Sequence, residues 1–307
     1  PGPTPAADLK YGSKGISFQD YIGLQMAVKT TTVKKYDRVY VMAVQVTPNG
    51  VETEIIEGVP FDAGPGYEDY YRVFDKKIVS WSMTEMVTMT VYGEKDGVLY
   101  VGETFENSVM GMALEKIDYY TNTKKDAEMC TTFVDMLNYG AAVQILNNYN
   151  ATNLPNATLE ELGYDEYATT QTPVLEAINS TSGTDTYKVI TDNFSMQDKV
   201  EIQLLVKAFD VETHEIRAFV DGELVENAFF DTTFMNGYVL VRVPMAAKNL
   251  RSTLTLSVNE IATGNAVTRT WTCSVEGYAK SKIGTATEAT AIAVMKYGDS
   301  VSVIANR

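Results

Sequence analysis

The chain repeats itself, and no other feature of the sequence constrains its fold as strongly. Three pairs of segments match in the same order: residues 16–29 with 194–207, residues 104–117 with 270–283, and Tyr139 and Gly140 with Tyr297 and Gly298. The first pair shares six of 14 residues, and the second shares seven of 14. Ordered matches of this kind are typical of tandem copies of one domain. We therefore predict a first repeat domain over residues 12–148 and a second over residues 186–307.

Each predicted copy begins with a strand in which apolar residues alternate with polar or small ones. The apolar positions are Ile22, Leu24, Met26 and Val28 in the first copy and Val200, Ile202, Leu204 and Val206 in the second. A period of two residues indicates a half-buried strand. Asn-Gly and Asp-Gly pairs ending at Gly50, Gly97 and Gly222 supply the left-handed residues of two-residue hairpins. Many short strands joined by hairpins predict an antiparallel β-sandwich.

Both copies then change to a helical pattern. Ser108 and Ser274 are predicted to cap short helices. A longer helix is expected over residues 125–147, and its counterpart over residues 287–304, because apolar residues recur there at helical spacing. The predicted fold class is mostly β with helices, an α+β protein. It consists of two tandem homologous β-sandwich domains, each closed by carboxy-terminal helices.

Two segments lie outside the predicted domains. Residues 1–11 carry Pro1, Pro3 and Pro5 and are expected to form an extended tail. Residues 149–185 are rich in Asn, Thr, Ser and Pro and are interpreted as a polar linker. An extended tail in front of a sandwich can add a strand to a neighbouring subunit. The three prolines and Leu9 are therefore the predicted assembly residues.

Charge and the rarer residue types exclude several classes of function. The 25 basic and 40 acidic side chains give a formal net charge of −15, which disfavours binding to nucleic acids or anionic membranes. No apolar run reaches the roughly 18 residues of a membrane-spanning helix, so no membrane insertion is expected. One histidine and two cysteines are too few for the common zinc sites. Neither a Walker A loop nor a nucleophile elbow occurs, and we expect a protein that is not an enzyme.

Aromatic residues are the predicted ligand-binding residues. Tyr67, Tyr70 and Tyr71 lie in a Gly- and Pro-containing acidic segment and can form a stacking platform for a sugar or a protein. Trp81 lies in a strand-like run, with core packing as the alternative to ligand binding. The partner expected of such residues is a glycan or a host protein.

The same segment holds the only metal candidate that we consider. Asp62, Glu68 and Asp69 offer the hard oxygen ligands that Ca²⁺ prefers. Their spacing matches no EF-hand, and acidic residues occur throughout the chain, so a solvated acidic loop is the alternative. No cofactor other than Ca²⁺ is expected.

The repeated motifs carry a resemblance to a known module. The pattern S-V-x-G-x-A begins at Ser108 and again at Ser274, and the first copy continues with M-L-N-Y-G-A-A-V over residues 136–143. These motifs resemble a repeated module of large secreted surface proteins of gut Clostridia and related Firmicutes, and so does the start of the linker, with Asn150, Thr152, Asn153 and Leu154. The second copy departs from the pattern after Gly298. Such modules sit beside Ig-like, leucine-rich or carbohydrate-active domains, so the resemblance implies a surface location and a non-enzymatic role.

These observations lead to one leading hypothesis and one alternative. The leading hypothesis is an extracellular cell-surface protein with a structural or adhesive role, which self-associates or contacts neighbouring surface proteins. In its sharper form, the tail joins subunits into a filament or layer. The alternative is a glycan- or host-protein-binding module that uses the exposed aromatic residues.

Overall fold

The computed structural model describes residues 2–61, 64–183, 187–207 and 210–307, apart from the side chains of residues 190–192. The chain divides into two compact units, Pro1–Tyr167 and Ala168–Arg307, which we call the first and second unit. The protein is mostly β with a few helices, so the predicted α+β class is confirmed. The boundary between the units falls inside the segment 149–185 that the sequence suggests as a linker.

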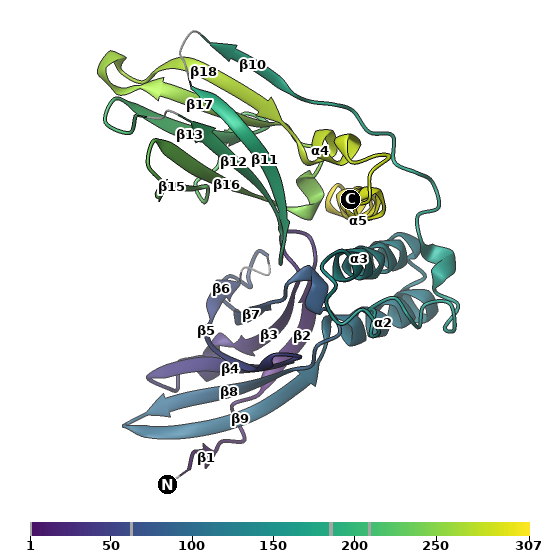
Figure 1. Cartoon of the computed structure of the whole chain (residues 1–307). Coiled ribbons are helices and arrows are strands. Elements are labelled where there is room, and N and C mark those ends of the chain that lie inside the picture. Colours follow the sequence, from purple (N-terminus) through teal and green to yellow (C-terminus); the bar gives the residue numbers. More distant parts are fainter. Residues whose placement is uncertain (1, 62–63, 184–186, 208–209) are drawn as a thin grey trace. The chain divides into compact units, whose positions relative to one another are not determined.

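The first unit contains two sheets (Figure 1). The five-stranded sheet has the order β1 (Thr4–Pro5), β9 (Val98–Asn107), β8 (Val87–Lys95), β4 (Arg38–Thr47) and β5 (Gly50–Glu57). The four-stranded sheet has the order β2 (Tyr11–Ser17), β3 (Gly23–Lys29), β7 (Tyr71–Lys77) and β6 (Val59–Phe61). All neighbours are antiparallel except β1 and β9, which are parallel. Both sheets place fully buried side chains in the core, among them Met26, Val41 and Met89.

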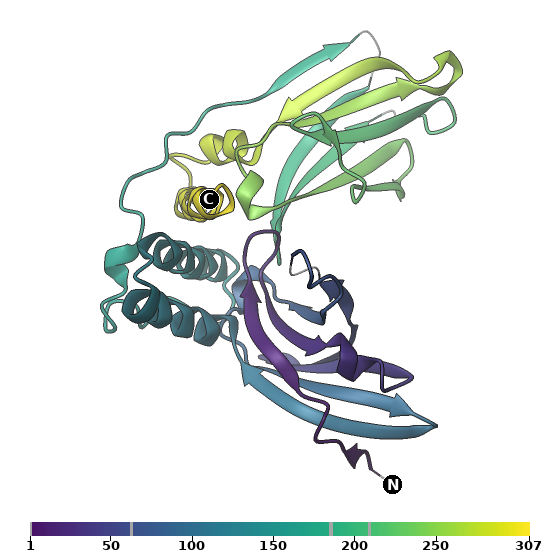
Figure 2. The same ribbon diagram turned by 180° about the vertical axis from the view of Figure 1, so that it is seen from behind.

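The two longer helices lie together at one end of these sheets (Figures 1 and 2). The helical elements of the first unit are α1 (Thr30–Val33), η1 (Ser80–Ser82), α2 (Val109–Tyr119), η2 (Tyr120–Lys124), α3 (Ala127–Leu146) and η3 (Asp165–Tyr167). The Ser108 side chain accepts a hydrogen bond from Gly111 N–H at 2.9 Å, so the predicted cap of α2 is confirmed. The predicted long helix is α3, which begins two residues later than expected.

The second unit also has two sheets, and its two longer helices lie at one end (Figure 1). Its five-stranded sheet has the order β10 (Ser180–Gly183), β18 (Ala266–Cys273), β17 (Leu254–Glu260), β13 (His214–Val220) and β14 (Glu223–Leu224). Its four-stranded sheet has the order β11 (Lys188–Met196), β12 (Val200–Lys207), β16 (Tyr238–Met245) and β15 (Phe229–Met235). The helical elements are η4 (Ala247–Asn249), η5 (Ile261–Thr263), α4 (Val275–Ser281) and α5 (Glu288–Ala305). Ser274 caps α4 by accepting from Gly277 N–H at 2.9 Å.

The two units differ in the strand that covers the edge of the five-stranded sheet. In the first unit β1 runs parallel to β9 and pairs only with Tyr100 and Val101. In the second unit β10 runs antiparallel to β18 and pairs with four residues, from Arg269 to Thr272. The edge that follows Val101 in β9 is therefore covered differently from its counterpart in β18.

Parts of the predicted tail and of the predicted linker pack against the first unit. Leu9 is completely buried, and its carbonyl oxygen accepts from Glu103 N–H at 2.8 Å. At the other end of the unit, the Gln144 side chain donates to the carbonyl oxygens of Asn150 and Asn153, both at 2.8 Å. Leu159 is also buried. Residues 149–167 thus belong to the first unit and not to a solvated linker.

Phenol groups of the first unit lead to a prediction about alkaline pH. Tyr149 Oη donates to the carboxylate of Glu85, which also accepts from Gln45 Nε2 at 2.5 Å. Burial and this hydrogen bond raise the pKa of Tyr149 to about 12. Burial and a hydrogen bond to Asp75 raise the pKa of Tyr21 to about 12, and burial and a hydrogen bond to Asp8 do the same for Tyr36.

A raised pKa means that the neutral phenol stabilises the folded state. This stabilisation is complete below the unfolded pKa of about 10 and is lost as the pH rises towards about 12. We expect the melting temperature of the first unit, followed by circular dichroism, to fall between pH 10 and 12. Tyr149→Phe should reduce the fall, whereas Tyr119→Phe, at an exposed position, should leave it unchanged. An equal fall in both variants would contradict the assignment to Tyr149.

Helix length and polarity set one limit on membrane association. Within the described ranges, no helix combines the length and the apolar character needed to cross a bilayer. α3 has 20 residues, but its sequence includes Glu128 and Asp135 as well as several polar residues.

Candidate functional site

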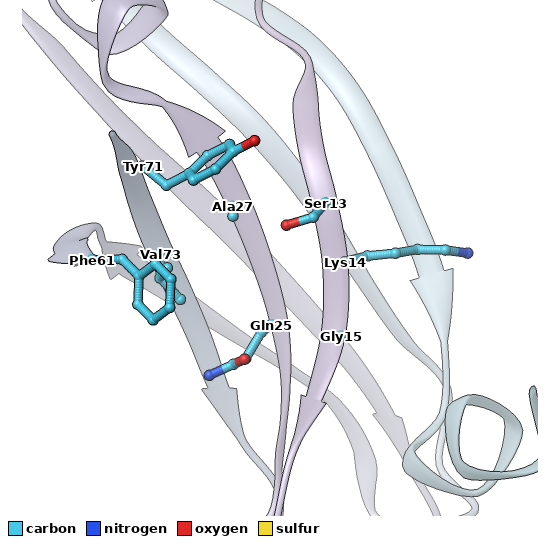
Figure 3. A pocket seen from close by; sticks show the side chains of 8 residues that line it. All are labelled: Ser13, Lys14, Gly15, Gln25, Ala27, Phe61, Tyr71 and Val73. Atoms are coloured by element: carbon cyan, nitrogen blue, oxygen red, sulfur yellow. The ribbon is translucent and has the colours of Figure 1, made fainter. Parts of the chain in front are cut away.

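A hollow of about 200 Å³ lies on the four-stranded sheet of the first unit (Figure 3). Met26 and Val28 of β3 are buried in the core, whereas Gln25 and Ala27 of the same strand line the hollow. The hollow is therefore on the face that points away from the core. Its lining residues are Ser13, Lys14, Gly15, Gln25, Ala27, Phe61, Tyr71 and Val73.

Small residues at neighbouring positions create this hollow. Ser13 pairs with Ala27, and Gly15 lies two residues further along β2, so short side chains lie next to one another here. In the second unit, Gln203 pairs with Asn193, and Leu205 pairs with Leu240. If Gln25 and Gln203 are matched, as in the repeat, larger residues stand at the corresponding positions. The side chains of the first unit, and not its strand order, thus account for the hollow.

Aromatic rings form one side of the hollow. Phe61 and Tyr71 are paired across β6 and β7, and both line the hollow (Figure 3). A Cβ atom on Gly12 would lie 2.9 Å from Cε1 of Tyr71, so the ring lies close against β2. Glycine at position 12 is what permits this position of the ring.

The three predicted tyrosines are brought together. The Tyr70 ring contacts that of Tyr71 edge to face at 4.8 Å between centroids, and the Tyr67 ring contacts that of Tyr70 at 5.6 Å. The ammonium group of Lys29 lies 5.8 Å from the Tyr70 centroid. Tyr67 is 56% exposed, so the row of rings extends from the hollow to solvent.

Apart from Lys14, the polar residues that line the hollow carry no charge. Ser13 offers a hydroxyl group and Gln25 a carboxamide, which can donate and accept hydrogen bonds. The side chain of Lys14 points away from the hollow (Figure 3), and its ammonium group lies 5.0 Å from the Phe105 centroid. The arrangement can therefore stack against an uncharged ligand and bind its hydroxyl groups.

Trp81 lies elsewhere in the first unit. It is half-buried in the short helix η1, so the strand predicted for this run is wrong. β7 ends at Lys77, and the chain then turns into η1, which contacts α3. Trp81 does not line the hollow, and its role in ligand binding stays a prediction.

The carboxylates of the calcium candidate have other contacts. Both carboxylate oxygens of Glu68 accept from Gly66 N–H, at 3.1 and 3.0 Å. Hydrogen bonds from its own backbone and from that of Gly66 lower the pKa of Glu68. Asp69 pairs with Arg72, while Asp62 lies outside the described residues. The residues that the structure describes include no group of three or more His, Cys, Asp or Glu side chains able to hold a metal ion, and Ca²⁺ binding stays a prediction.

Strand pairing reveals residues that the sequence does not single out. Phe61, Ser13 and Gln25 are brought to Tyr71 from three other strands, and no sequence spacing indicates this. A partial signal exists in the second unit, where Tyr238 pairs with Lys207 as Tyr71 pairs with Lys29. Tyr238 is therefore a counterpart of Tyr71, although the rest of the tyrosine cluster belongs to the first unit.

Comparison with known proteins adds no assignment. No protein-family model matches the chain, and no curated protein matches it. The resemblance to a clostridial surface module accordingly stays an expectation based on the repeated motifs.

Proposed function

We propose that the chain is a non-catalytic, extracellular cell-surface protein that binds a neutral sugar in the hollow of its first unit. One observation carries this proposal: the Tyr71 and Phe61 rings flank a hollow that also has the uncharged polar groups of Ser13 and Gln25, while the ammonium group of Lys14 is directed away. A sugar presents an apolar face of C–H groups and a rim of hydroxyl groups. An aromatic ring suits the face, and the groups of Ser13 and Gln25 suit the rim.

The volume of the hollow and the net charge of the chain limit the class of ligand. Drug-sized ligands occupy pockets of about 300–1,000 Å³, and the hollow of about 200 Å³ is smaller. It suits one sugar residue of a longer glycan. The net charge of −15 disfavours sialylated or sulfated glycans, because like charges repel. A neutral terminal or side-chain sugar is therefore the proposed ligand class.

The lining also supports binding in place of catalysis. Its side chains are rings, an amide, a hydroxyl and alkyl groups, with the ammonium group of Lys14 directed away. None of the groups that face the hollow is a carboxylate or an imidazole, the side chains that most often transfer protons in enzymes. Binding to a surface glycan would give the chain an adhesive role.

The second unit fits the proposal as a homologous spacer. We propose that the chain consists of two tandem β-sandwich domains, and the equal order of strands in the two units supports this. The cap hydrogen bonds of Ser108 and Ser274, at the same place in the repeat and of the same length, support it further. Leu205 stands where the first unit has Ala27, so the second domain would display the first without binding sugar itself.

Self-association through the tail is a second candidate function. The observation that favours it is the burial of Leu9 at the edge of the five-stranded sheet. A tail held by one buried side chain and few backbone hydrogen bonds can exchange between identical subunits. The structural role in a filament or layer would follow from such exchange.

Paired variants test the sugar site. Tyr71→Ala should weaken binding of a neutral oligosaccharide about tenfold or more, on the scale of the roughly 1–3 kcal/mol that one aromatic ring contributes when a nucleobase stacks on it. Ala27→Leu should abolish binding by filling the hollow, and leucine at the matched position 205 shows that a strand of this sheet type accepts it. Tyr238→Ala is the matched control and should bind like the parent chain. A glycan array followed by calorimetry with the best neutral and acidic oligosaccharides provides the measurement.

Three results would count against the proposal. One is unchanged affinity in Ala27→Leu with a folded first unit, and another is a preference for acidic glycans. The third is binding only to a host protein, which would favour the alternative partner of the exposed tyrosines.

A further inference from the structure

We propose that the edge of β9 at residues 104–107, which we call the vacant edge, accepts an extended, hydroxyl-rich strand from another protein chain. The strand would run antiparallel to β9. This inference is independent of the sugar site, which lies on the other sheet. It rests on a comparison of the vacant edge with the corresponding edge of the second unit.

The second unit shows how such an edge is covered. Ser180 pairs with Thr272, and Ser182 pairs with Thr270, in antiparallel register. The hydroxyl groups of Ser182 and Thr270 lie 2.7 Å apart, and those of Ser180 and Thr272 are also in contact. A short strand of Ser, Thr and Gly thus satisfies this edge through its backbone and adds a row of side-chain hydrogen bonds.

The matched positions of the first unit lack such a strand. In the repeat, Thr270 corresponds to Thr104 and Thr272 to Glu106, and both of these first-unit residues are exposed. β1 pairs only with Tyr100 and Val101 of β9, and the N–H group of Glu103 donates to the carbonyl oxygen of Leu9. Within the described part of the chain, no strand pairs with residues 104–107 on this side. An unpaired edge of this kind is a template for strand addition.

The path that leads to the edge differs between the two units. In the second unit, Glu176 N–H donates to the carboxylate of Glu276 at 3.0 Å, and the chain then passes over the start of α4. A Cβ atom on Gly277 would lie only 3.0 Å from the backbone nitrogen of Ile178, so glycine makes room for this path. Gly111 holds the corresponding place at the start of α2, and there the Asn107 side chain lies against it, because a Cβ atom on Gly111 would lie 2.2 Å from Oδ1 of Asn107. A partner strand that followed the same path would therefore have to displace the Asn107 side chain.

Charge specifies the partner further. Glu106 replaces the threonine that faces Ser180 in the second unit, so a basic or hydroxyl side chain suits the partner at this position. Glu103 carries a second carboxylate near the same edge, which accepts from Tyr11 N–H at 3.2 Å. The fitting partner is therefore an extended Ser- and Thr-rich segment that is neutral or basic, and not an acidic one.

A synthetic peptide tests this inference. The probe is a fluorescent peptide with the sequence of residues 174–183 and the change Glu176→Gln (VLQAINSTSG), which leaves no charged side chain, titrated into the whole chain. We expect saturable binding in fluorescence anisotropy, together with slower amide hydrogen exchange at residues 104–107. The exposed edge strand β5 is the internal control, and its exchange should not change.

Charge exchange defines the register. Ser180→Lys in the peptide should tighten binding about twofold to fivefold, as expected for one opposite-charge pair across strands. Glu106→Lys in the protein should reverse this preference, whereas Glu52→Lys on β5 should not. Ala27→Leu should bind the peptide like the parent chain, which separates this test from the sugar site.

Three outcomes would overturn the inference. The first is no binding at millimolar peptide, and the second is a lysine preference that Glu106→Lys leaves unchanged. The third is protection at residues 269–273 in place of 104–107, because the peptide would then displace β10 from its own edge.

Discussion

Replacing Leu9 by alanine is expected to lower the free energy of unfolding of the first unit by about 2–5 kcal/mol, the range for truncating a buried leucine. Leu9 is completely buried although it lies within the first ten residues of the chain. A Cβ atom on Gly93 would lie 3.0 Å from Cδ1 of Leu9, and one on Gly102 would collide with the backbone of Leu9. Two glycines on neighbouring strands therefore form a socket that this side chain fills.

Calorimetry of the whole chain can measure this effect. The transition of the first unit should move to lower temperature in Leu9→Ala, and that of the second unit should not. Gly102→Ala should have a similar effect, because its Cβ atom would collide with the backbone of Leu9 and keep the tail from packing on β9. Pro3→Ala is the control at an exposed position of the tail. A change below about 0.5 kcal/mol in Leu9→Ala would be within the usual range of surface substitutions and would contradict the socket.

The same variant bears on the proposed self-association. If subunits exchange tails, the parent chain should form polymers in light scattering and negative-stain microscopy, and Leu9→Ala and removal of residues 1–10 should both abolish them. Polymers that persist without the tail would rule out tail exchange. The first unit of the shortened chain should still fold, with a lower melting temperature. Calorimetry therefore separates loss of assembly from loss of the fold.

Local patterns predicted the elements well where they depend on neighbouring residues. The alternation that begins at Ile22 gave β3, and the one that begins at Val200 gave β12. Ser108 and Ser274 cap helices as expected, because a cap depends on residues three positions apart. Trp81 is the exception, since a run of apolar and β-branched residues does not distinguish a strand from a short helix.

Contacts between distant segments were not predictable in the same way. The composition of residues 1–11 indicates an extended chain, but the socket for Leu9 exists only after β8 and β9 have paired. The segment 149–167 is polar, yet Leu159 and the side-chain hydrogen bonds of Gln144 fix it to the first unit. Both errors have one cause: a few side chains can anchor a segment whose average composition is that of a linker.

The candidate site was predicted in part. The sequence places Tyr67, Tyr70 and Tyr71 in one segment, and their rings do contact one another. The hollow itself depends on Ala27 and Gly15, which come from other strands. Its location follows from the register of the sheet, and a single sequence does not contain that register.

Leucine in place of Gly140 or Gly298 is expected to destabilise the corresponding unit by about 3 kcal/mol or more, at the upper end of the range for overpacking a core. A Cβ atom on Gly140 would lie 2.5 Å from Sδ of Met83 and 3.1 Å from the carbonyl oxygen of Ser80. A Cβ atom on Gly298 would lie 2.7 Å from Leu250. The repeated glycines thus allow α3 to approach the short helix η1 and α5 to approach the short helix η4.

Alanine at the same positions gives a finer test. Gly→Ala within a helix gains about 1 kcal/mol from helix propensity, which opposes the steric cost. Gly298→Ala should be the more destabilising of the two, since Leu250 is branched at Cγ, whereas Met83 is unbranched and can adjust. Ile145→Leu and Val303→Leu, at exposed positions of α3 and α5, are the controls. Calorimetry should show each effect in its own unit, and stabilisation by both alanine variants would mean that the repeated Tyr-Gly pair does not serve close packing.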